Sequence, residues 1–457
     1  MIYDIIVIGS GPGGHVAAEK LAKVGRKVLL VEKERLGGIC LNWGCIPTKA
    51  LLKSAQAFHY VDKAAEYGIA LDGQAKPDFQ KMVERSRGVA DQMNKGIDFL
   101  MKKSGVEVVF GVAKINSDKT VTIITSEGVE NKVSAECIIL AVGAHGRQLP
   151  NLKQDGKYII GYREAMTLKQ QPKSMVVVGS GAIGSEFAHF YQTIGTQVTL
   201  VEFMPTIVPN EDKEIASTLQ RCFKKNGMKV YTSTSVDKVE VVEEHCIVTL
   251  SGKKTEILEC DIVLSAVGVE TNLVGLGLEA VGVQVERGKV VVDDYYRTNV
   301  KGIYAIGDIV HGPALAHVAS AEAIVCVNNI LGKQTLPLNY SNIPGCTYTT
   351  PEIASVGLSE DKAKEQGYEV KIGKFMFMAS GKATASGNRD GFIKVVLDAK
   401  TDLILGCSMI GDNVTEMIEE IVIARQMNLT GKQILSTVHP HPTMSEGVME
   451  ALASCEE

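Results

Sequence analysis

The chain has 457 residues, of which 45% are hydrophobic and 22% charged, with a formal net charge of −5 and a pI ≈ 6.1. This length allows about three domains, and the composition is that of a soluble globular protein. The weakly acidic balance gives no reason to expect nucleic acid or an anionic membrane as a partner, and no apolar run approaches the ~20 residues that span a bilayer. The first residues lack the features of a secretory signal, so we expect a cytoplasmic protein or one that has lost a targeting segment.

The N-terminal segment predicts a dinucleotide-binding βαβ unit. Residues 5–33 contain an apolar β-strand pattern, the glycine motif GxGxxG, an amphipathic helix and a second strand that ends at Glu32. Gly9, Gly11 and Gly14 let the backbone turn tightly and approach a pyrophosphate, which then lies at the positive end of the helix. Glu32 is placed to accept hydrogen bonds from a ribose. A single motif of this kind also fits an ordinary glycine-rich loop.

Residues 37–49, GGICLNWGCIPTK, contain two cysteines close together, Cys40 and Cys45. A metal site normally needs four ligands, and no second Cys or His pair occurs at a matching spacing. Two buried thiols are plausible but leave the surrounding glycines unexplained. A disulfide requires the helix to be distorted, because residues five apart in a regular helix are too far apart, and Gly44 permits that distortion. The other eight cysteines are spaced singly, and we expect them to be inert thiols of the core or surface.

The dinucleotide motif occurs twice. Residues 175–203 repeat the first unit 170 positions later, with Gly179, Gly181, Gly184 and Glu202 in the places of the first three glycines and the glutamate. Two complete units predict two dinucleotides on one chain. Residues 202–209 contain no Arg or Lys to hold a 2′-phosphate, which Glu202 would also repel, so NAD is favoured over NADP at this second site.

Three further strands are predicted between and after these units. Residues 138–144 and 262–268 are apolar runs that end in the sequence AVG, and each closes a block that follows a glycine motif. Residues 298–309 predict a short buried strand that ends at Gly307 and Asp308. A ligand-contacting aspartate at the carboxyl end of a strand fits this pattern, although a Gly-Asp pair is more often a plain turn.

The C-terminal sequence VHPHPTMSE offers a candidate base. His441 lies between two prolines that fix the backbone, and histidine takes up protons near neutral pH. Glu446 is spaced to orient its imidazole, and the bond between residues 441 and 442 is a candidate cis peptide. The alternative is structural, because Thr443 and Glu446 form the T-x-x-E pattern of a helix-capping box.

The order of these motifs, together with YTTPEIASVG at 348–357, resembles that of the disulfide-containing flavoprotein reductases almost from end to end. The resemblance implies tightly but non-covalently bound FAD at the first glycine motif and NAD⁺/NADH at the second. It implies no metal. The residues that it assigns to FAD are Gly9, Gly11, Gly14, Glu32, Lys49, Ala113, Gly143, Asp308 and Ala316. Those that it assigns to NAD are Gly179, Gly181, Gly184, Glu186, Glu202 and Gly268, with Glu186 also expected to pair with Lys49.

The same resemblance implies roles for the remaining candidates. Cys40 and Cys45 form a redox-active disulfide in which Cys40 is the outer interchange thiol and Cys45 lies against the flavin. His441 is the base, oriented by Glu446, and it completes the site of the other subunit of a homodimer. Two positions depart from the family pattern: Trp43 replaces a smaller residue, and residues 269–272 lack the usual basic residue and proline.

The expected fold is α/β, with two Rossmann-like dinucleotide-binding domains and a C-terminal α+β dimerisation domain. The expected boundaries are 1–148 and 272–340 for the FAD domain, 149–271 for the NAD domain and 341–457 for dimerisation. In its NAD preference and its histidine motif, the chain resembles the members of this family that oxidise dihydrolipoamide. These members act on dihydrolipoamide held on the lipoyl domains of 2-oxo acid dehydrogenase or glycine cleavage complexes. A glutathione- or mercuric-reductase-like enzyme, or an FAD redox sensor or scaffold of low turnover, are the alternatives.

Overall fold

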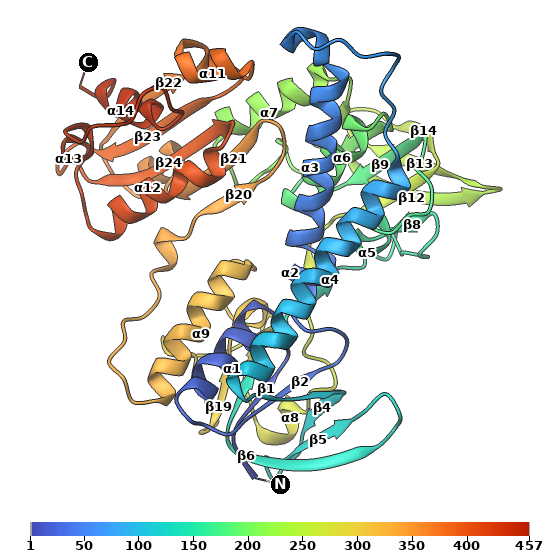
Figure 1. The fold of residues 1–457 in the computed structure, drawn as a ribbon, viewed down its shortest axis with the longest axis vertical. Coiled ribbons are helices and arrows are strands. Elements are labelled where there is room, and N and C mark those ends of the chain that lie inside the picture. The colour runs from blue at the N-terminus through green and yellow to red at the C-terminus, as the bar shows by residue number, and fades with distance from the viewer. Residues whose placement is uncertain (1, 457) are drawn as a thin grey trace. The chain divides into compact units, whose positions relative to one another are not determined.

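The computed structural model describes residues 2–456, which divide into two compact units (Figure 1). Unit 1 comprises Met1–Ala50, Lys81–Arg147 and Val269–Leu338, and unit 2 comprises Leu51–Gln80, Gln148–Gly268 and Asn339–Glu457. Two helices, α3 (Cys45–Asp62) and α4 (Phe79–Ser104), contain points at which the chain passes from one unit to the other. The division into four sequence ranges given above stays a prediction.

Unit 1 is built on a parallel sheet in the order β3-β2-β1-β6, extended by β19 on β6. Its strands are β1 (Ile2–Ile8), β2 (Val28–Glu32), β3 (Glu107–Phe110), β6 (Glu130–Leu140) and β19 (Ile303–Ala305). Ile8 lies opposite Val31 on one side and Leu140 on the other, so three strands end at the same edge. Nearly all side chains of β1 and β2 are buried, as expected of a parallel sheet covered on both faces.

Helices α1 (Pro12–Lys23) and α9 (Ala316–Ile330) lie side by side in unit 1 (Figure 1). A Cβ atom on Gly13 would lie 3.0 Å from the Ala319 carbonyl oxygen, so this glycine sets how closely the two helices approach. The long strand β6 also continues into an antiparallel sheet. The remaining elements of unit 1 are α2 (Gly38–Trp43), β4 (Val112–Ile115), β5 (Val121–Ile124), β7 (Ala144–Gly146), β16 (Val269–Thr271), α8 (Leu278–Val281), β17 (Val285–Glu286) and β18 (Lys289–Val290).

Unit 2 contains the second parallel sheet, in the order β11-β10-β9-β15-β8, and beside it an antiparallel sheet, β12-β13-β14. The elements of this part are β8 (Ile159–Ile160), α5 (Tyr162–Ala165), β9 (Ser174–Val178), α6 (Ala182–Thr193), β10 (Gln197–Val201), α7 (Lys213–Lys225), β11 (Lys229–Tyr231), β12 (Ser235–Val242), β13 (His245–Ser251), β14 (Glu256–Cys260) and β15 (Ile262–Ser265).

The C-terminal part of unit 2 is an antiparallel sheet in the order β20-β21-β24-β23-β22, accompanied by helices. Its elements are β20 (Gly345–Thr347), β21 (Glu352–Gly357), α10 (Glu360–Glu365), β22 (Val370–Met376), α11 (Gly381–Ser386), β23 (Phe392–Asp398), β24 (Ile404–Gly411), α12 (Val414–Gln426), α13 (Gly431–Leu435) and α14 (Glu446–Ala453). The expected fold class, two Rossmann-like domains and a C-terminal α+β domain, is confirmed.

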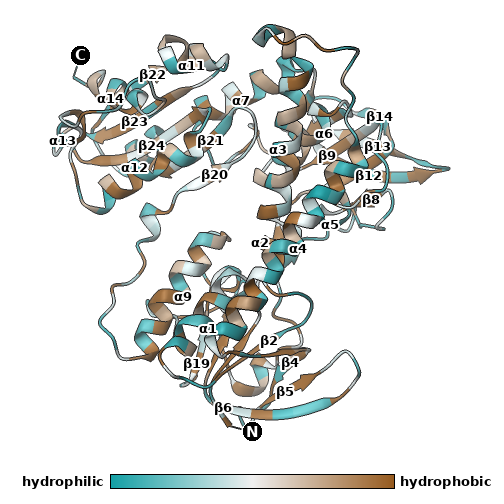
Figure 2. Ribbon diagram, in the orientation of Figure 1, coloured by the Kyte–Doolittle hydropathy of each residue, from teal (hydrophilic) through white to brown (hydrophobic). Residues whose placement is uncertain are grey.

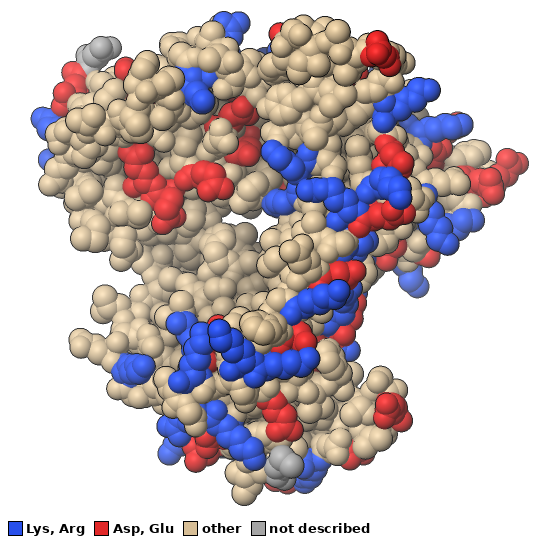
Figure 3. All heavy atoms as spheres, viewed as in Figure 1, with Lys and Arg blue, Asp and Glu red and all other residues tan. Residues whose placement is uncertain are grey.

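Apolar residues concentrate in the strands and on the inner faces of the helices (Figure 2). Lys and Arg are interspersed with Asp and Glu on the face drawn in Figure 3. Within residues 2–456, no helix combines the length and the apolar character that crossing a bilayer requires.

Candidate functional site

The first glycine motif forms a tight turn between β1 and α1, and its three glycines have different reasons to lack a side chain. A Cβ on Gly9, whose φ is +98°, would overlap the Ala141 carbonyl. A Cβ on Gly14 would overlap the Gly9 carbonyl. Gly11 faces open space and caps the N-terminus of α1 without a side-chain hydrogen bond. Free backbone amides at a helix N-terminus beside open space fit a pyrophosphate.

Glu32, at the end of β2, is buried and held by three donors. Its Oε2 accepts from the Ser10 amide (3.0 Å) and the Ser10 hydroxyl (2.6 Å), and its Oε1 accepts from the Glu34 amide (2.9 Å). A carboxylate has about four acceptor positions. Counting the donors of residues 2–456, one position on Oε1 is left to accept from a ribose hydroxyl.

The second motif reproduces this geometry in unit 2. Glu202 accepts from the Ser180 amide (2.8 Å), the Ser180 hydroxyl (2.6 Å) and the Met204 amide (2.8 Å). A Cβ on Gly179 would overlap the Ala266 carbonyl, and one on Gly184 would overlap the Gly179 carbonyl. The agreement of the two copies in both backbone and side-chain contacts fits a dinucleotide at each.

The serine of each motif is a functional residue that the sequence reasoning missed. Besides holding the glutamate, each hydroxyl accepts a backbone hydrogen bond of 3.2 Å from the following loop, Ser10 from Gly37 and Ser180 from Val208. The signal was present, because the two serines recur at the same 170-residue offset as the glycines.

The other residues assigned to FAD are all in unit 1, most of them near the carboxyl edge of the parallel sheet. Gly143 follows β6 with a φ of +64°, Asp308 lies in the turn after β19, and Ala316 begins α9. Burial raises the pKa of the Asp308 carboxyl, and the Gly307 amide donates to the buried Glu322 (2.6 Å), which fixes this turn. Ala113 is buried on β4, and Lys49 lies in the first turns of α3.

The cysteine segment is fixed against the first glycine motif. Gly37 and Gly38 have φ values of +89° and +60°, and a Cβ on Gly38 would lie 2.7 Å from the Gly11 Cα. Helix α2, which begins at Gly38, carries Cys40 and ends at Trp43, whereas α3 begins at Cys45. Gly44 interrupts the helical path, as the sequence predicted, with a Cβ position only 3.1 Å from the Ile39 carbonyl oxygen.

This interruption brings the two thiols together. Cys40 and Cys45 are both in the thiol form in the structure, and their side chains hydrogen-bond to each other. That hydrogen bond, with burial, raises the pKa of Cys40. Cys45 is the more exposed of the two and is the first residue of α3. The two sulfurs are therefore in contact, and the redox-active disulfide between them stays a prediction.

Trp43 has defined partners that account for a large residue at this position. Its indole N–H donates to Glu34 (3.0 Å), and the Arg87 guanidinium lies over the ring at 4.4 Å. Arg87 also donates from Nη2 to the Asn42 carbonyl (2.5 Å). The tryptophan thus ties the end of α2 to the loop after β2 and to α4. Nothing in these contacts directs it toward the thiols.

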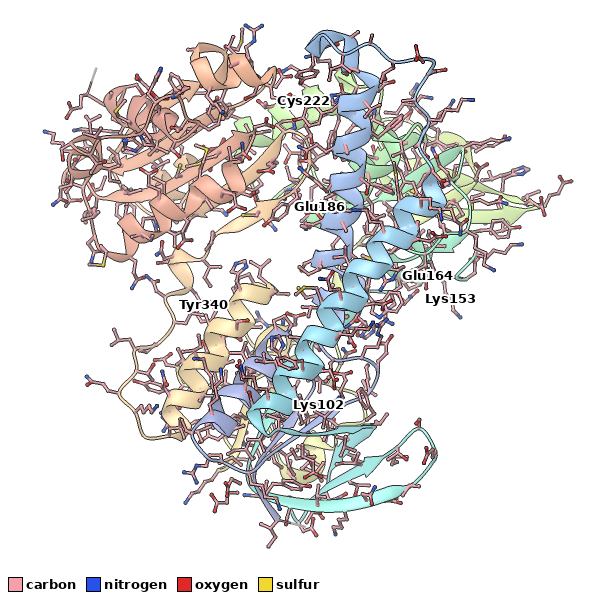
Figure 4. All side chains as sticks on the ribbon, viewed as in Figure 1. Lys102, Lys153, Glu164, Glu186, Cys222 and Tyr340 are labelled. Atoms are coloured by element: carbon pink, nitrogen blue, oxygen red, sulfur yellow. The ribbon has the colours of Figure 1, made fainter. Side chains whose placement is uncertain are left out.

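The second glycine motif is accompanied by Glu186 and Gly268. Glu186 is buried on α6 (labelled in Figure 4) and accepts from the Tyr348 amide (3.1 Å). Its pairing with Lys49, which lies in unit 1, stays a prediction. Gly268 has a φ of +105° and faces open space. Phe203, directly after Glu202, is 73% exposed, so an apolar surface occupies the place where NADP-specific sites need positive charge.

The segment that departs from the family pattern has a structural role in unit 1. Residues 269–271 form β16, which pairs with β7 where the chain leaves and re-enters this unit. Asn272 donates from its side chain to the Val142 carbonyl (2.9 Å) and from its backbone to the Gly143 carbonyl (3.0 Å). His145 lies 2.8 Å from the Asn272 Oδ1. The asparagine thus holds the loop that contains Gly143.

His441 and Glu446 are in contact in unit 2. The Nδ1 atom of His441 lies 2.7 Å from Oε1 of Glu446, the His441 side chain is 78% exposed, and the His441–Pro442 bond is cis, as expected. The other oxygen of Glu446 accepts from the Thr443 amide (2.8 Å), and Thr443 Oγ1 accepts from the Glu446 amide (3.4 Å). Thr443 and Glu446 thus make both hydrogen bonds of the capping-box pattern, although the helix itself begins at Glu446 with Ser445 at its N-cap, and the same carboxylate contacts His441. His439 is engaged separately, 2.8 Å from Glu420.

Comparison with known proteins identifies the same family in the N-terminal and the C-terminal parts of the chain. Residues 3–323 match the model of the pyridine nucleotide-disulphide oxidoreductases, and residues 343–452 match the dimerisation domain of the same family. The chain is 45% identical to the dihydrolipoyl dehydrogenase of Rhizobium etli, over 98% of this chain and 97% of the relative. It is 38% identical to that of Bacillus subtilis, over 99% and 98%.

Solved structures agree with these matches. LpdA from Mycobacterium tuberculosis superimposes with a TM-score of 0.92 at 26% identity, covering 98% of this chain and 99% of that one. The HOCl-induced flavoprotein disulfide reductase RclA from Escherichia coli gives a TM-score of 0.88 at 25% identity, covering 99% of each chain. The chain therefore belongs to the pyridine nucleotide-disulphide oxidoreductase family.

Proposed function

We propose that the protein is a dihydrolipoyl dehydrogenase that binds FAD at the first glycine motif and NAD⁺ at the second. The observation that carries this proposal is the packing of Gly38 against Gly11, which fixes the thiol pair Cys40–Cys45 beside the first nucleotide turn. The names of the full-length relatives support the substrate. The acceptor position on each buried glutamate and the open backbone at each turn support two dinucleotides.

The chain's own residues supply the thiol chemistry. The Nδ1 atom of His441 bonds to the Glu446 carboxylate, so this nitrogen carries the proton and Nε2 is left to accept one from a dihydrolipoyl thiol. The resulting thiolate attacks Cys40 of the oxidised pair, which breaks the bond to Cys45 and leaves Cys45 as a thiolate. The second substrate thiol then attacks the mixed disulfide, so that lipoyl disulfide leaves and Cys40 is reduced. FAD, when bound, would carry two electrons from the reduced cysteine pair to NAD⁺.

The nucleotide preference follows from the second motif. The Glu202 carboxylate suits the free 2′-hydroxyl of NAD, and the exposed Phe203 provides no charge for a 2′-phosphate. We therefore propose NAD⁺ as the hydride acceptor.

The assembly follows from the location of the base. His441 belongs to the segment that matches the dimerisation domain of the family, so we propose a homodimer in which each histidine completes the partner's thiol site. Lipoyl domains of 2-oxo acid dehydrogenase or glycine cleavage complexes are the proposed protein partners.

The test combines a spectrum with two assays. The purified protein is expected to be yellow and to develop long-wavelength absorbance on partial reduction, from a Cys45 thiolate beside the flavin. Turnover is then measured with dihydrolipoamide and NAD⁺, and separately with glutathione disulfide and NADPH. Fast turnover with the first pair is expected; fast turnover only with the second would contradict the proposed substrate, and a colourless protein would contradict the proposed cofactor.

A further inference from the structure

A second pair of cysteines faces each other in unit 2, far along the chain from Cys40 and Cys45. Cys246 on β13 and Cys260 on β14 are direct partners in the register of two antiparallel strands. Such partners have Cα atoms about 4.5–5.5 Å apart, which lies inside the range of about 4.4–6.8 Å that a disulfide needs. Their side chains already hydrogen-bond to each other as free thiols.

The side chains around Cys246 and Cys260 are mostly apolar. Both side chains are buried, in a core cluster that includes Val176 and Val263 from the parallel sheet. Cys246 also contacts the Tyr158 carbonyl, with a sulfur–oxygen distance of 3.6 Å. Nowhere in residues 2–456 do three His, Cys, Asp or Glu side chains gather in a way that could hold a metal ion, so the two sulfurs have no third ligand.

The position of the pair in its hairpin gives an oxidant a route. Cys246 is the second residue of β13 and Cys260 is the last residue of β14, so both lie at the open end of the hairpin, away from the turn that joins the two strands. Strand ends open locally at a lower free energy than strand centres. Access to the sulfurs therefore requires local opening at this end. Because Cys246 is also paired with Val241 of β12, we expect the opening to be rare and the reaction to be slow.

We propose that Cys246 and Cys260 form a second disulfide, separate from the catalytic pair, when the protein meets a peroxide. The Cys246 thiolate attacks the peroxide oxygen, which gives a sulfenic acid and releases water after protonation. The Cys260 sulfur then attacks the sulfenic sulfur, the S–S bond forms and a second water leaves. Two thiols are oxidised by two electrons in total, and one hydrogen peroxide is reduced to two waters.

The order of attack is supported by electrostatics. The hydrogen bond from Cys260 lowers the pKa of Cys246, whereas the same contact and burial raise the pKa of Cys260. Cys246 is thus the thiol that ionises first. The bond would close the β13–β14 hairpin, whose sheet shares its core with β9, the strand that leads into Gly179. The proposal does not depend on which substrate the enzyme uses.

The experiment is a peptide map of the holoenzyme. One sample is reduced and one is treated with hydrogen peroxide; each is alkylated under denaturing conditions and digested without reductant. We expect a cross-linked peptide that contains residues 246 and 260, lighter by two hydrogens than the sum of its parts, and formed more slowly than the Cys40–Cys45 link. This measurement uses the unmodified chain, so it does not depend on the folding of a variant.

Matched variants assign the effect. In the unmodified chain, peroxide is expected to raise the thermal unfolding midpoint by several degrees, and dithiothreitol is expected to reverse this rise. The control variant C222S, which removes a buried cysteine on α7 (Figure 4), should show the same rise. C246S and C260S are expected to lose this rise. The proposal would be overturned if Cys246 and Cys260 could still be fully alkylated after Cys40 and Cys45 were completely oxidised. It would also be overturned if peroxide converted Cys246 and Cys260 to sulfinic acids without a cross-link.

Discussion

At the scale of single residues, Glu446 shows how one side chain serves two purposes. Its Oε1 contacts His441, while its Oε2 accepts from the Thr443 amide at the start of α14. The hydrogen bond from the Thr443 amide, and after it the one with His441, lowers the pKa of Glu446. Because the folded-state pKa is lowered, the carboxylate stays charged until the pH falls below its ordinary value of 4.5, so its support for His441 is complete at neutral pH.

We predict that Glu446→Gln lowers kcat about 10- to 100-fold with dihydrolipoamide while the flavin content is unchanged. The substitution removes the charge-assisted hydrogen bond to His441, so the carboxylate no longer favours the proton on Nδ1. Steady-state kinetics and the flavin spectrum check the result. Thr443→Ala is the control. It removes the hydroxyl that accepts from the Glu446 amide and donates to the Pro440 carbonyl (2.7 Å), but it keeps the Thr443 amide that donates to Glu446. It should cost about 1 kcal/mol of stability with kcat retained. Equal loss of kcat in both variants would contradict the orienting role.

At the scale of elements, the cysteine segment consists of the short helix α2 and the first residues of the long helix α3, and glycines set the ends of α2. Gly38 begins α2 in contact with Gly11, and Gly44 separates α2 from α3. The position of the thiol pair is therefore set by the packing of α2 against the first glycine motif and not by a single continuous helix.

We predict that Gly38→Ala weakens FAD binding at least tenfold, or about 1.4 kcal/mol, because the new Cβ would push α2 away from Gly11. Flavin retained after dialysis is the measurement. Gly25→Ala is the matched control, since Gly25 also has a positive φ, +84°, but its Cβ would face open space. Both variants carry a backbone penalty of roughly 1–2 kcal/mol, and only Gly38→Ala should lose flavin. Unchanged flavin content in Gly38→Ala would show that the contact is not needed.

A buried ion cluster holds several elements of unit 2 together. Lys394 on β23 has a side chain only 5% exposed, and its Nζ lies 3.1 Å from Asp212, 2.9 Å from Glu214 and 2.8 Å from Glu360. Asp212 and Glu214 lie at the start of α7, whereas Glu360 begins α10. Hydrogen bonds from Lys364 and Lys394 lower the pKa of Glu360 to about 2.

We predict that Lys394→Met costs about 3–5 kcal/mol in the free energy of unfolding at pH 7, because it leaves the buried Asp212 carboxylate, whose side chain is 5% exposed, without its cation. Since the folded-state pKa of Glu360 is lowered, this difference should be present above pH 4.5 and shrink as the pH falls toward 2. Denaturant titrations at several pH values measure it. Lys374→Met removes a more exposed partner of Glu214 and should cost less than about 1 kcal/mol. Equal costs for the two variants would contradict the importance of burial.

At the scale of the whole molecule, the proposed catalytic groups are distributed over the chain. The thiols lie in unit 1 and His441 lies in the C-terminal sheet domain of unit 2, which matches a dimerisation domain. A homodimer that shares its sites makes each protomer depend on the other for activity.

We predict that mixing His441→Ala and Cys45→Ala subunits restores about a quarter of the normal activity. Random reassortment makes half of the dimers mixed, and each mixed dimer has one complete site, formed by Cys45 of one subunit and His441 of the other. Activity is measured before and after mild dissociation and reassembly of the two inactive variants. Reassembly of mixed dimers without any rise in activity would show that each site is made by one chain.

Much of the fold and of the nucleotide sites was predictable from the sequence, because the responsible patterns are local. Gly9 and Gly179 have φ values of +98° and +95° directly after a strand, and a Cβ on Gly14 or Gly184 would overlap the carbonyl of the glycine five residues before it. Glu32 and Glu202 follow at a fixed spacing. The interruption at Gly44 and the pairing of His441 with Glu446 likewise act over five residues or fewer. The roles of Ser10 and Ser180 were missed although their repetition was visible.

The amino-acid sequence alone therefore determined the two βαβ units, the cysteine pair and the histidine motif, since short-range sterics and hydrogen bonding encode them. Only the tertiary structure decided which distant residues meet: Arg87 with Trp43, Lys394 with Asp212, and Cys246 with Cys260. The reason is physical. Strand register and helix packing select these partners through burial of the whole core, and no local spacing records that selection.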